Sequence, residues 1–531
     1  MKKKYVRWTL WTIASPFILF VILCILIYLP PIQNFLVDKA AVYASEATGM
    51  NISVGRISLS FPLNLVVTNV DAASPHNDTL LSVRRLQVNV QLLPLLKKQV
   101  EVDGISLQGA TVNSNDLIHG MKLNGTLGEL FISSHGVALD PETAIVNKVL
   151  LKDTDLSLCL NDTAAADTAA SDTAYWKIIL QDIDLQNVSF ALDMPLDSLS
   201  LAASLDNAIL RDGLIDLHKS AYSLQTFRIK NGRVRYDSGK PLAADSLSSG
   251  LDPSHIVLTD IGVKLDSLYY EGRNMKAIIS QFVLKERSGV EIVSATGRMV
   301  SNDKVLRVPS LKLETRDSYL ELNAAMDWNA LDFKDEGLVS ARLMADIGKP
   351  DVVRFMGSMD EKFIRQYPSE PLRIRTGIDG DLNKLKLTTL TAELPGALGL
   401  FARGELTHLT DSLLRGGDIT LEAETKDLKF VSTLAEGIEI PYGTRLEGKF
   451  TMAGTKMGTD LLLMQPEAQA VVAADTIPIT VYNDSISVAD DFKMERAARL
   501  FAKYDLSRDR YEADLAVNHF DLHQFMPADS L

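Results

Sequence analysis

One segment has the spacing of a nucleotide-binding loop. Gly443, Gly448 and Lys449 follow the pattern G-x-x-x-x-G-K, in which backbone amides and a lysine hold phosphate groups. The next position, which should carry Ser or Thr for magnesium, is Phe450, and the residues KFTMAG alternate as in a strand. The helix N-terminus that would hold a phosphate is therefore missing. We predict that this segment is part of a strand and binds no nucleotide.

Two histidines have the spacing of a metal site. His519 and His523 are four residues apart, with Asp521 between them, and on a helix they would present two ligands on one face. The glutamate of the H-E-x-x-H pattern is absent, and the alternation just before them indicates the end of a strand. We interpret both as solvated turn histidines and predict no metal ion and no cofactor.

A low-complexity segment carries a possible modification signal. Residues 161–175 contain three D-T-A triplets, which resemble the O-glycosylation acceptor pattern of periplasmic proteins in the Bacteroidetes. The candidate acceptors are Thr163, Thr168 and Thr173. Ordinary linker composition is the other interpretation, because the segment has no apolar period and is typical of a loop between sheet segments.

Patterns that would indicate catalysis are missing. The sequence has no G-x-S-x-G elbow, no C-x-x-C pair and no D-x-D-x-D-G loop. Paired acids such as Asp153 with Asp155 lie two apart on predicted strands, so both face the polar side, where water is the expected partner. We therefore predict that the chain is not an enzyme.

Most of the chain after residue 50 alternates between apolar and polar residues, which predicts strands with one apolar face. Short turn signals separate the alternating runs and predict antiparallel neighbours. These signals are Asp103-Gly104, Asp212-Gly213, Asn231-Gly232, Ser288-Gly289 and Pro395-Gly396. From the period alone, the candidate residues lining an apolar surface are Leu86, Val88, Val90, Leu92, Leu398, Leu400, Leu515 and Val517.

Three similar segments indicate a degenerate repeat of helix or turn plus strands, a pattern typical of elongated structures. They are DVVRFM (351–356), DLKFVS (427–432) and DLHQFM (521–526). The first predicts one helix that Asp351 caps and Pro368 ends, with Phe355 and Phe363 on its apolar stripe. The chain stops at Leu531, inside the third copy, so we expect a fragment or a truncated product.

The N-terminus has the features of a membrane anchor. Residues 8–29 are uncharged and long enough to cross a bilayer, and Lys2, Lys3, Lys4 and Arg7 precede them, which predicts a cytoplasmic N-terminus and an exported body. A cleaved signal peptide is the competing interpretation, and the length of the apolar run and the lack of an A-x-A site directly after it favour the retained anchor. Residues 32–48 have apolar positions at helical spacing and predict a short amphipathic helix. All 68 acidic residues but only 50 of the 54 basic ones follow the span, so the body should repel nucleic acid.

These features predict an order of regions along the chain. They are a cytoplasmic tip and anchor (1–30), an amphipathic helix (31–49), a first β region (50–160), a flexible loop (161–175), a β segment (176–345) and a repeat-like β segment (346–531). The predicted fold class is mainly β with a few short helices.

Two segments after the anchor resemble a known family. ISVGRISLSFPLNLVVTNV (52–70) and DTLLSVRRLQVNVQLLPLLKKQVEVDGISLQGATV (78–112) are similar to the start of AsmA-like proteins, in particular the TamB-type translocation and assembly module proteins of Bacteroidetes-like organisms. The resemblance covers the first 112 residues well and the remainder loosely. The resemblance does not extend to the C-terminal domain of TamB, so a shorter relative of AsmA remains the alternative to TamB.

The resemblance implies a long antiparallel sheet bent into a taco-like groove, anchored in the inner membrane with its body in the periplasm. The implied function is passive transport of glycerophospholipids toward the outer membrane, with the acyl chains held on the apolar side. The alternative is an assembly factor that docks an outer-membrane barrel-assembly protein, through the missing C-terminal part, and supports protein insertion or secretion. Alternation by itself fits an open groove and a closed sandwich equally; the resemblance favours the groove.

Overall fold

The computed structural model describes most of the body of the chain. The described residues are Lys39, Ala41, Val42, Ser45 and the ranges 50–60, 64–74, 79–90, 102–114, 121–138, 142–161, 176–239, 250–333, 337–357, 360–434, 439–465, 468–474, 477–482 and 497–526. The predicted anchor (8–29), most of the predicted amphipathic helix (32–48), Leu92 and the three candidate acceptor threonines lie outside them. None of the helices within the described ranges has the length and hydropathy of a membrane span.

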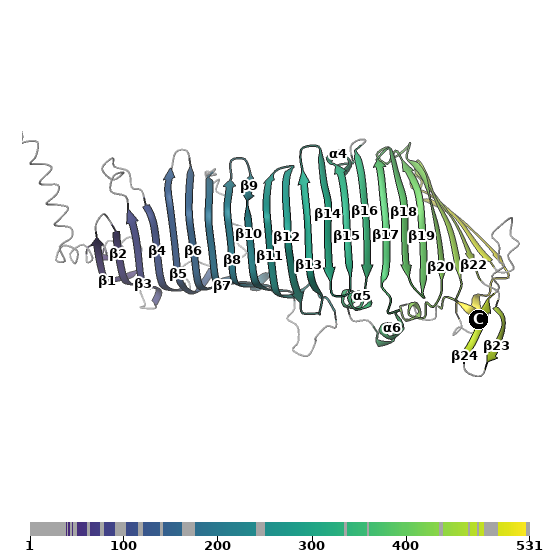
Figure 1. Cartoon of the computed structure of the whole chain (residues 1–531), viewed down its shortest axis with the longest axis horizontal. Coiled ribbons are helices and arrows are strands. Elements are labelled where there is room, and N and C mark those ends of the chain that lie inside the picture. Colours follow the sequence, from purple (N-terminus) through teal and green to yellow (C-terminus); the bar gives the residue numbers. More distant parts are fainter. Residues whose placement is uncertain are drawn as a thin grey trace, which may run out of the picture. The chain divides into compact units, whose positions relative to one another are not determined.

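The chain divides into two compact units, each built mainly on one large sheet (Figure 1). Unit 1 comprises residues 1–243 and 253–272, and unit 2 comprises residues 244–252 and 273–531. This confirms the prediction of a mainly β protein with few helices.

In unit 1 each strand pairs with the next along the chain, except that β9 and β10 together occupy one position between β8 and β11. The strands are β1 (Asn51–Ser60), β2 (Asn64–Ala73), β3 (Thr79–Val90), β4 (Val102–Asn113), β5 (Met121–Ala138), β6 (Thr143–Leu160), β7 (Lys177–Met194), β8 (Leu199–Asp216), β9 (Ala221–Leu224), β10 (Thr226–Ser238) and β11 (His255–Glu271), with the 3-10 helix η1 (Pro195–Asp197).

One pairing in unit 1 departs from the predicted antiparallel order. β6 and β7 run parallel in register, from Thr143 opposite Lys177 to Cys159 opposite Asp193. Parallel neighbours need a connection of a dozen residues or more, and the segment 161–176 supplies that length. The low-complexity segment therefore lies at the one point among the described pairings of unit 1 where a short turn could not join the strands.

Unit 2 is an antiparallel meander in which β25 follows β22 in the sheet and β23 and β24 form a separate hairpin. Its strands are β12 (Asn274–Glu286), β13 (Glu291–Ser301), β14 (Val305–Thr315), β15 (Tyr319–Asp327), β16 (Leu338–Ile347), β17 (Leu372–Asp381), β18 (Lys384–Leu394), β19 (Leu398–Thr407), β20 (Gly416–Thr425), β21 (Arg445–Ala453), β22 (Lys456–Met464), β23 (Ala468–Ala474), β24 (Ile477–Tyr482), β25 (Ala497–Asp505) and β26 (Arg510–Asn518). Its helices are α4 (Trp328–Leu331), α5 (Lys349–Met356), α6 (Glu361–Gln366), η2 (Val431–Thr433) and η3 (Leu522–Gln524).

The single helix predicted after Asp351 is wrong, because the structure has two short helices there. Gly357 adopts φ 77° and ends α5, and Asp360 caps α6 by accepting from the backbone N–H of Lys362. Asp351 lies inside α5, where it is 1% exposed and accepts from the hydroxyls of Thr315 and Ser318. It thus ties α5 to the β14–β15 turn instead of capping a helix.

The larger of two buried clusters in unit 2 lies where α6 meets the ends of β18 and β19. We call it the rim cluster, and it consists of Phe363, Tyr367, Leu394, Ala397, Leu428 and Phe430. The rings of Phe363 and Phe430 pack edge to face at 5.7 Å. α5, η2 and η3 follow β16, β20 and β26, three strands that run in the same direction. The three similar sequence segments therefore all follow the C-terminal ends of parallel-running strands, the side of the sheet on which α5 is labelled in Figure 1.

Three of the five predicted turns are wrong. Ser288-Gly289 and Pro395-Gly396 do join consecutive strands, β12 to β13 and β18 to β19. The other three lie inside strands: Asp103-Gly104 in β4, Asp212-Gly213 in β8 and Asn231-Gly232 in β10. Asp212 and Asn231 have φ of 51° and 52°, so each pair changes the course of one strand without reversing it.

Candidate functional site

The most extensive chemical feature of unit 1 is a pair of apolar rows that cross its sheet at right angles to the strands. Residues directly opposite each other on paired strands share a face, so the register identifies each row. The first row is Ile57, Val67, Leu86, Leu107, Leu130, Leu151, Leu185, Ala208, Ile229 and Val263. The second is Leu59, Leu65, Val88, Ile105, Ile132, Val149, Ile183, Leu210, Phe227 and Leu265. No polar residue interrupts either row.

These rows remain accessible to solvent. Ala208 is buried, Ile105 is 37% exposed, and the others are half-buried. Among the described residues of unit 1, the fully buried hydrophobic side chains are mostly alanines, with Leu80 and Val83 the only larger ones. An apolar sheet face normally packs against a second layer. Within the described part of unit 1 no second layer lies on the two rows, and we call them, as far as the described residues go, an uncovered apolar face.

Unit 2 carries an apolar face of the same kind. One of its rows reads Leu311, Leu322, Leu343, Thr376, Leu390, Ala402, Leu421, Gly448, Leu461, Leu500 and Leu515. The neighbouring row reads Leu313, Leu320, Ala345, Ile374, Ala392, Leu400, Ala423, Leu446, Leu463, Ala498 and Val517. Apart from Thr376 and Gly448, every position is an aliphatic side chain.

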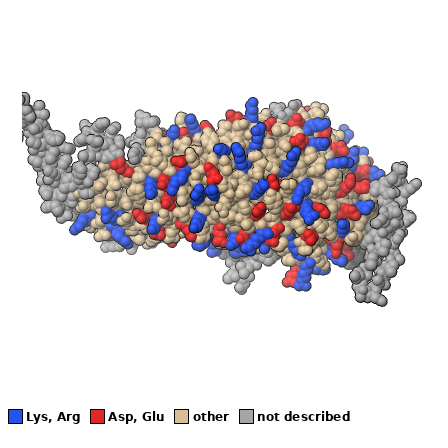
Figure 2. All heavy atoms as spheres, in the orientation of Figure 1, with Lys and Arg blue, Asp and Glu red and all other residues tan. Residues whose placement is uncertain are grey.

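The opposite face of the unit 2 sheet is charged. Cross-strand ion pairs lie on it, including Arg375 with Asp346 at 2.7 Å and Lys449 with Asp418 at 3.4 Å. Arg499 donates to Asp460 at 2.5 Å, and this hydrogen bond lowers the pKa of the Asp460 carboxyl. Figure 2 shows acidic and basic side chains interspersed over the visible surface. Each exposed pair contributes little to stability, but together they keep this face hydrated.

The structure places the predicted lining residues as follows. Leu86 and Val88 belong to the rows of unit 1, and Val90, opposite Val102, continues the same face of β3. Leu400, Leu515 and Val517 belong to the rows of unit 2, where Leu515 is 64% and Val517 58% exposed. Leu398 packs against the rim cluster.

Most row residues were not among the sequence candidates. Leu107, Leu130, Leu151 and Leu185 continue the row that Leu86 marks, one on each successive strand. The same alternation marks these strands, but its phase shifts by one residue within each of them, which hides the common face from a simple count of odd and even positions.

The two segments first considered for chemistry have a different backbone geometry from the one that their motifs require. Lys449 lies within β21, so a strand continues where a phosphate-binding loop would begin a helix. His519 follows the end of β26 with φ 47°, and His523 lies in η3, so the two histidines do not share one helix face.

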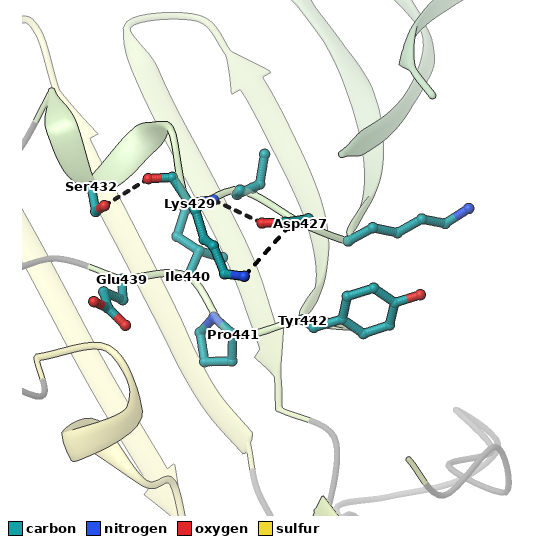
Figure 3. A pocket seen from close by; sticks show the side chains of 9 residues that line it. Asp427, Lys429, Ser432, Glu439, Ile440, Pro441 and Tyr442 are labelled. Carbon is teal, nitrogen blue, oxygen red and sulfur yellow. Dashed lines mark hydrogen bonds and ion pairs between the residues drawn. The ribbon is translucent and has the colours of Figure 1, made fainter. Parts of the chain in front are cut away.

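One pocket lies beside the rim cluster, between η2 and the start of β21 (Figure 3). Leu428 and Ile440 give it an apolar side, while Lys429 pairs with Asp427 at 3.7 Å at its mouth. The Ser432 hydroxyl donates to the carbonyl of Lys429 at 2.6 Å. The pocket thus combines apolar contacts with one exposed ion pair.

Comparison of the chain with models of known protein families, with characterised proteins and with solved structures gives no match.

Proposed function

We propose that this protein is a membrane-anchored periplasmic conduit that carries glycerophospholipids between the inner and outer membranes and so supports outer-membrane biogenesis. The single observation that carries the proposal is the pair of uninterrupted, uncovered apolar rows across unit 1. The resemblance of residues 52–112 to AsmA-like proteins supports the same function.

The apolar face suits acyl chains for an energetic reason. Moving a methylene group from an apolar surface into water costs about 0.8 kcal/mol, so a lipid tail needs continuous apolar contact along its path. Because every strand contributes one apolar side chain to each row, one step along the rows resembles the next, and a tail can move without a large barrier. The head group stays in water beside the sheet. Transport is then passive, and its direction is set outside this chain.

Adjacent leucines on β6 provide the test. Leu151 belongs to the first apolar row, whereas Leu150 lies opposite Phe131 and Asp184 on the other face, and both are half-buried. The protein is purified in mild detergent, and bound phospholipid is quantified by mass spectrometry for Leu151→Arg and Leu150→Arg. We expect the first variant to lose most of its lipid and the second to retain it. An unmodified protein without lipid, or equal loss in both variants, would refute the conduit.

A second function, docking of an outer-membrane assembly partner, is favoured by β26. Among the described strands β26 pairs only with β25, and it presents Leu515 and Val517 on one face and Glu512 and Asp514 on the other. Such an edge can receive a further strand through its backbone. Replacing Ala513, which lies on β26 outside both apolar rows, by Pro should block strand addition while leaving bound lipid unchanged. If outer-membrane integrity then fails with lipid still bound, the docking function gains.

A further inference from the structure

Each long strand of unit 1 contains a point where alternation fails and two successive residues leave the apolar face. On β7, Leu185 is followed by Gln186 and Asn187 before the apolar positions resume at Val188. On several strands the second residue of the pair has a positive φ between 50° and 62°, the left-handed region that favours Gly, Asn and Asp. These residues are Asn69, Gly109, Asp153, Asn187, Asn231 and Asp260.

The break positions lie side by side. Asn187 donates to the Asp153 carboxylate at 2.8 Å, and Asn231 donates to Asp206 on the next strand at 2.5 Å. A Cβ on Gly128 would lie 2.8 Å from that of Asp153, which shows how closely these backbones approach. The breaks therefore form a continuous line across the sheet, which we call the first break line.

A second break line crosses the longer strands on the other side of the two apolar rows. On β6 it is Asn147 and Lys148, which together face the single residue Ser133 of β5 through a register shift. Asn147 donates to Gln181 of β7 at 3.0 Å, and the next residue of β7, Asp182, forms an ion pair with Arg211 of β8. Asp212, directly after Arg211, has a φ of 51°. Between the two lines each strand contributes two apolar side chains, one to each row.

A strand must bend where two neighbouring side chains project from one face, because these side chains need room on the outer side of the bend. Asn69, Asp153, Asn187 and Asp260 are exposed, so the polar face is the outer side. We propose that the two break lines are fold axes along which the sheet of unit 1 bends around its apolar face, and that the two rows between them are the floor on which lipid tails lie. The floor rests on the proposed function; the fold axes do not.

The dimensions of the floor define what it can hold. Neighbouring strands are about 4.8 Å apart, so the rows extend for roughly 43 Å across unit 1, and they are separated by about 7 Å along each strand. One leaflet of a bilayer has a hydrocarbon depth of about 15 Å, half of the full core. The floor is therefore long enough for about three lipid tails end to end and narrow enough to arrange them in single file.

The fold axes are tested by a distance that needs no lipid. Spin labels at Lys177 and Ala191, on either side of both lines on β7, would be about 46 Å apart in a straight strand. We expect a clearly shorter distance. Replacing Asp153, Asn187 and Asn231 together by Val, which rejects positive φ, should lengthen or broaden it, and replacing the same three by Gly should not. A straight-strand distance in the unmodified protein, or a folded Val variant with unchanged distance, overturns the proposal. Should the Val variant not fold, the unmodified distance still decides.

The floor is tested by the position of a charge. Leu185 lies on the floor, and Phe190, 38% exposed, lies on the same face of β7 beyond the first break line. We expect Leu185→Arg to reduce co-purifying phospholipid at least fivefold and Phe190→Arg to reduce it less than twofold. Equal losses would overturn the floor. A short label distance in a protein that binds no lipid would instead leave the fold axes standing and reject the proposed function.

Discussion

Replacing Phe363 by alanine should destabilise the rim cluster of unit 2. This side chain is 2% exposed and packs against Tyr367 at 5.6 Å and Phe430 at 5.7 Å, which joins α6 to the segment that follows β20. Truncating a buried phenylalanine to alanine costs about 3–5 kcal/mol, and the loss of the edge-to-face ring contacts is part of that cost. Phe355, on the neighbouring helix α5, is 56% exposed and serves as a control of the same residue type.

Hydrogen exchange measures this effect locally. If opening of the rim limits exchange, Phe363→Ala should accelerate the amides of α6 and of residues 428–434 by two to nearly four powers of ten, since about 1.4 kcal/mol corresponds to a factor of ten. Phe355→Ala should change them by about twofold or less. Similar exchange rates in the two variants, or equal acceleration of exchange throughout unit 2, would refute the view that the rim cluster stabilises its surroundings independently of the rest of unit 2.

Two further predictions concern pH and backbone conformation. Arg499 lowers the pKa of Asp460 in the folded protein, so their pair should stabilise unit 2 above the ordinary carboxyl pKa and lose this contribution as pH falls through the lower folded pKa. When the urea midpoint of unfolding is measured against pH, Arg499→Met should flatten the curve in that pH range. A curve identical to that of the unmodified protein would contradict the prediction. Gly289 has φ 95° in the β12–β13 turn, so Gly289→Ala should lower the free energy of unfolding by about 1–2 kcal/mol in chemical denaturation. Gly399→Ala, at an open site without positive φ, should leave it nearly unchanged. Equal effects of the two substitutions would contradict the conformational argument.

The sequence predicts the class of fold because alternation acts on each strand separately. Leu86 and Val88 share one face of β3, and Leu515 and Val517 share one face of β26, because alternation within a strand depends on that strand alone. What alternation does not specify is the partner of each strand. The parallel pairing of β6 with β7 follows from a long connection, and nothing in the apolar pattern of either strand distinguishes it from an antiparallel pair.

The errors at the turn signals have one physical cause. Asn231-Gly232 and Asp212-Gly213 supply residues that tolerate positive φ, which a hairpin turn and a mid-strand break both require. The flanking residues separate the two cases. At a break, the apolar positions continue at once with their phase shifted by one, as from Ile229 to Gly232 and Val234, and two polar residues replace the usual one. That doubled polar pair was readable in the sequence and would have located the apolar rows.

The break lines also bear on how such a sheet changes in evolution. Since every long strand of unit 1 carries its own break residues and its own two floor residues, the cross-section is encoded strand by strand. Gain or loss of a complete hairpin would change the length of the sheet and leave its profile intact. A single residue inserted between Leu150 and Leu151 would be far more damaging, because it moves the rest of β6 to the wrong face. Homologues should therefore differ in numbers of hairpins much more than in the lengths of strand interiors.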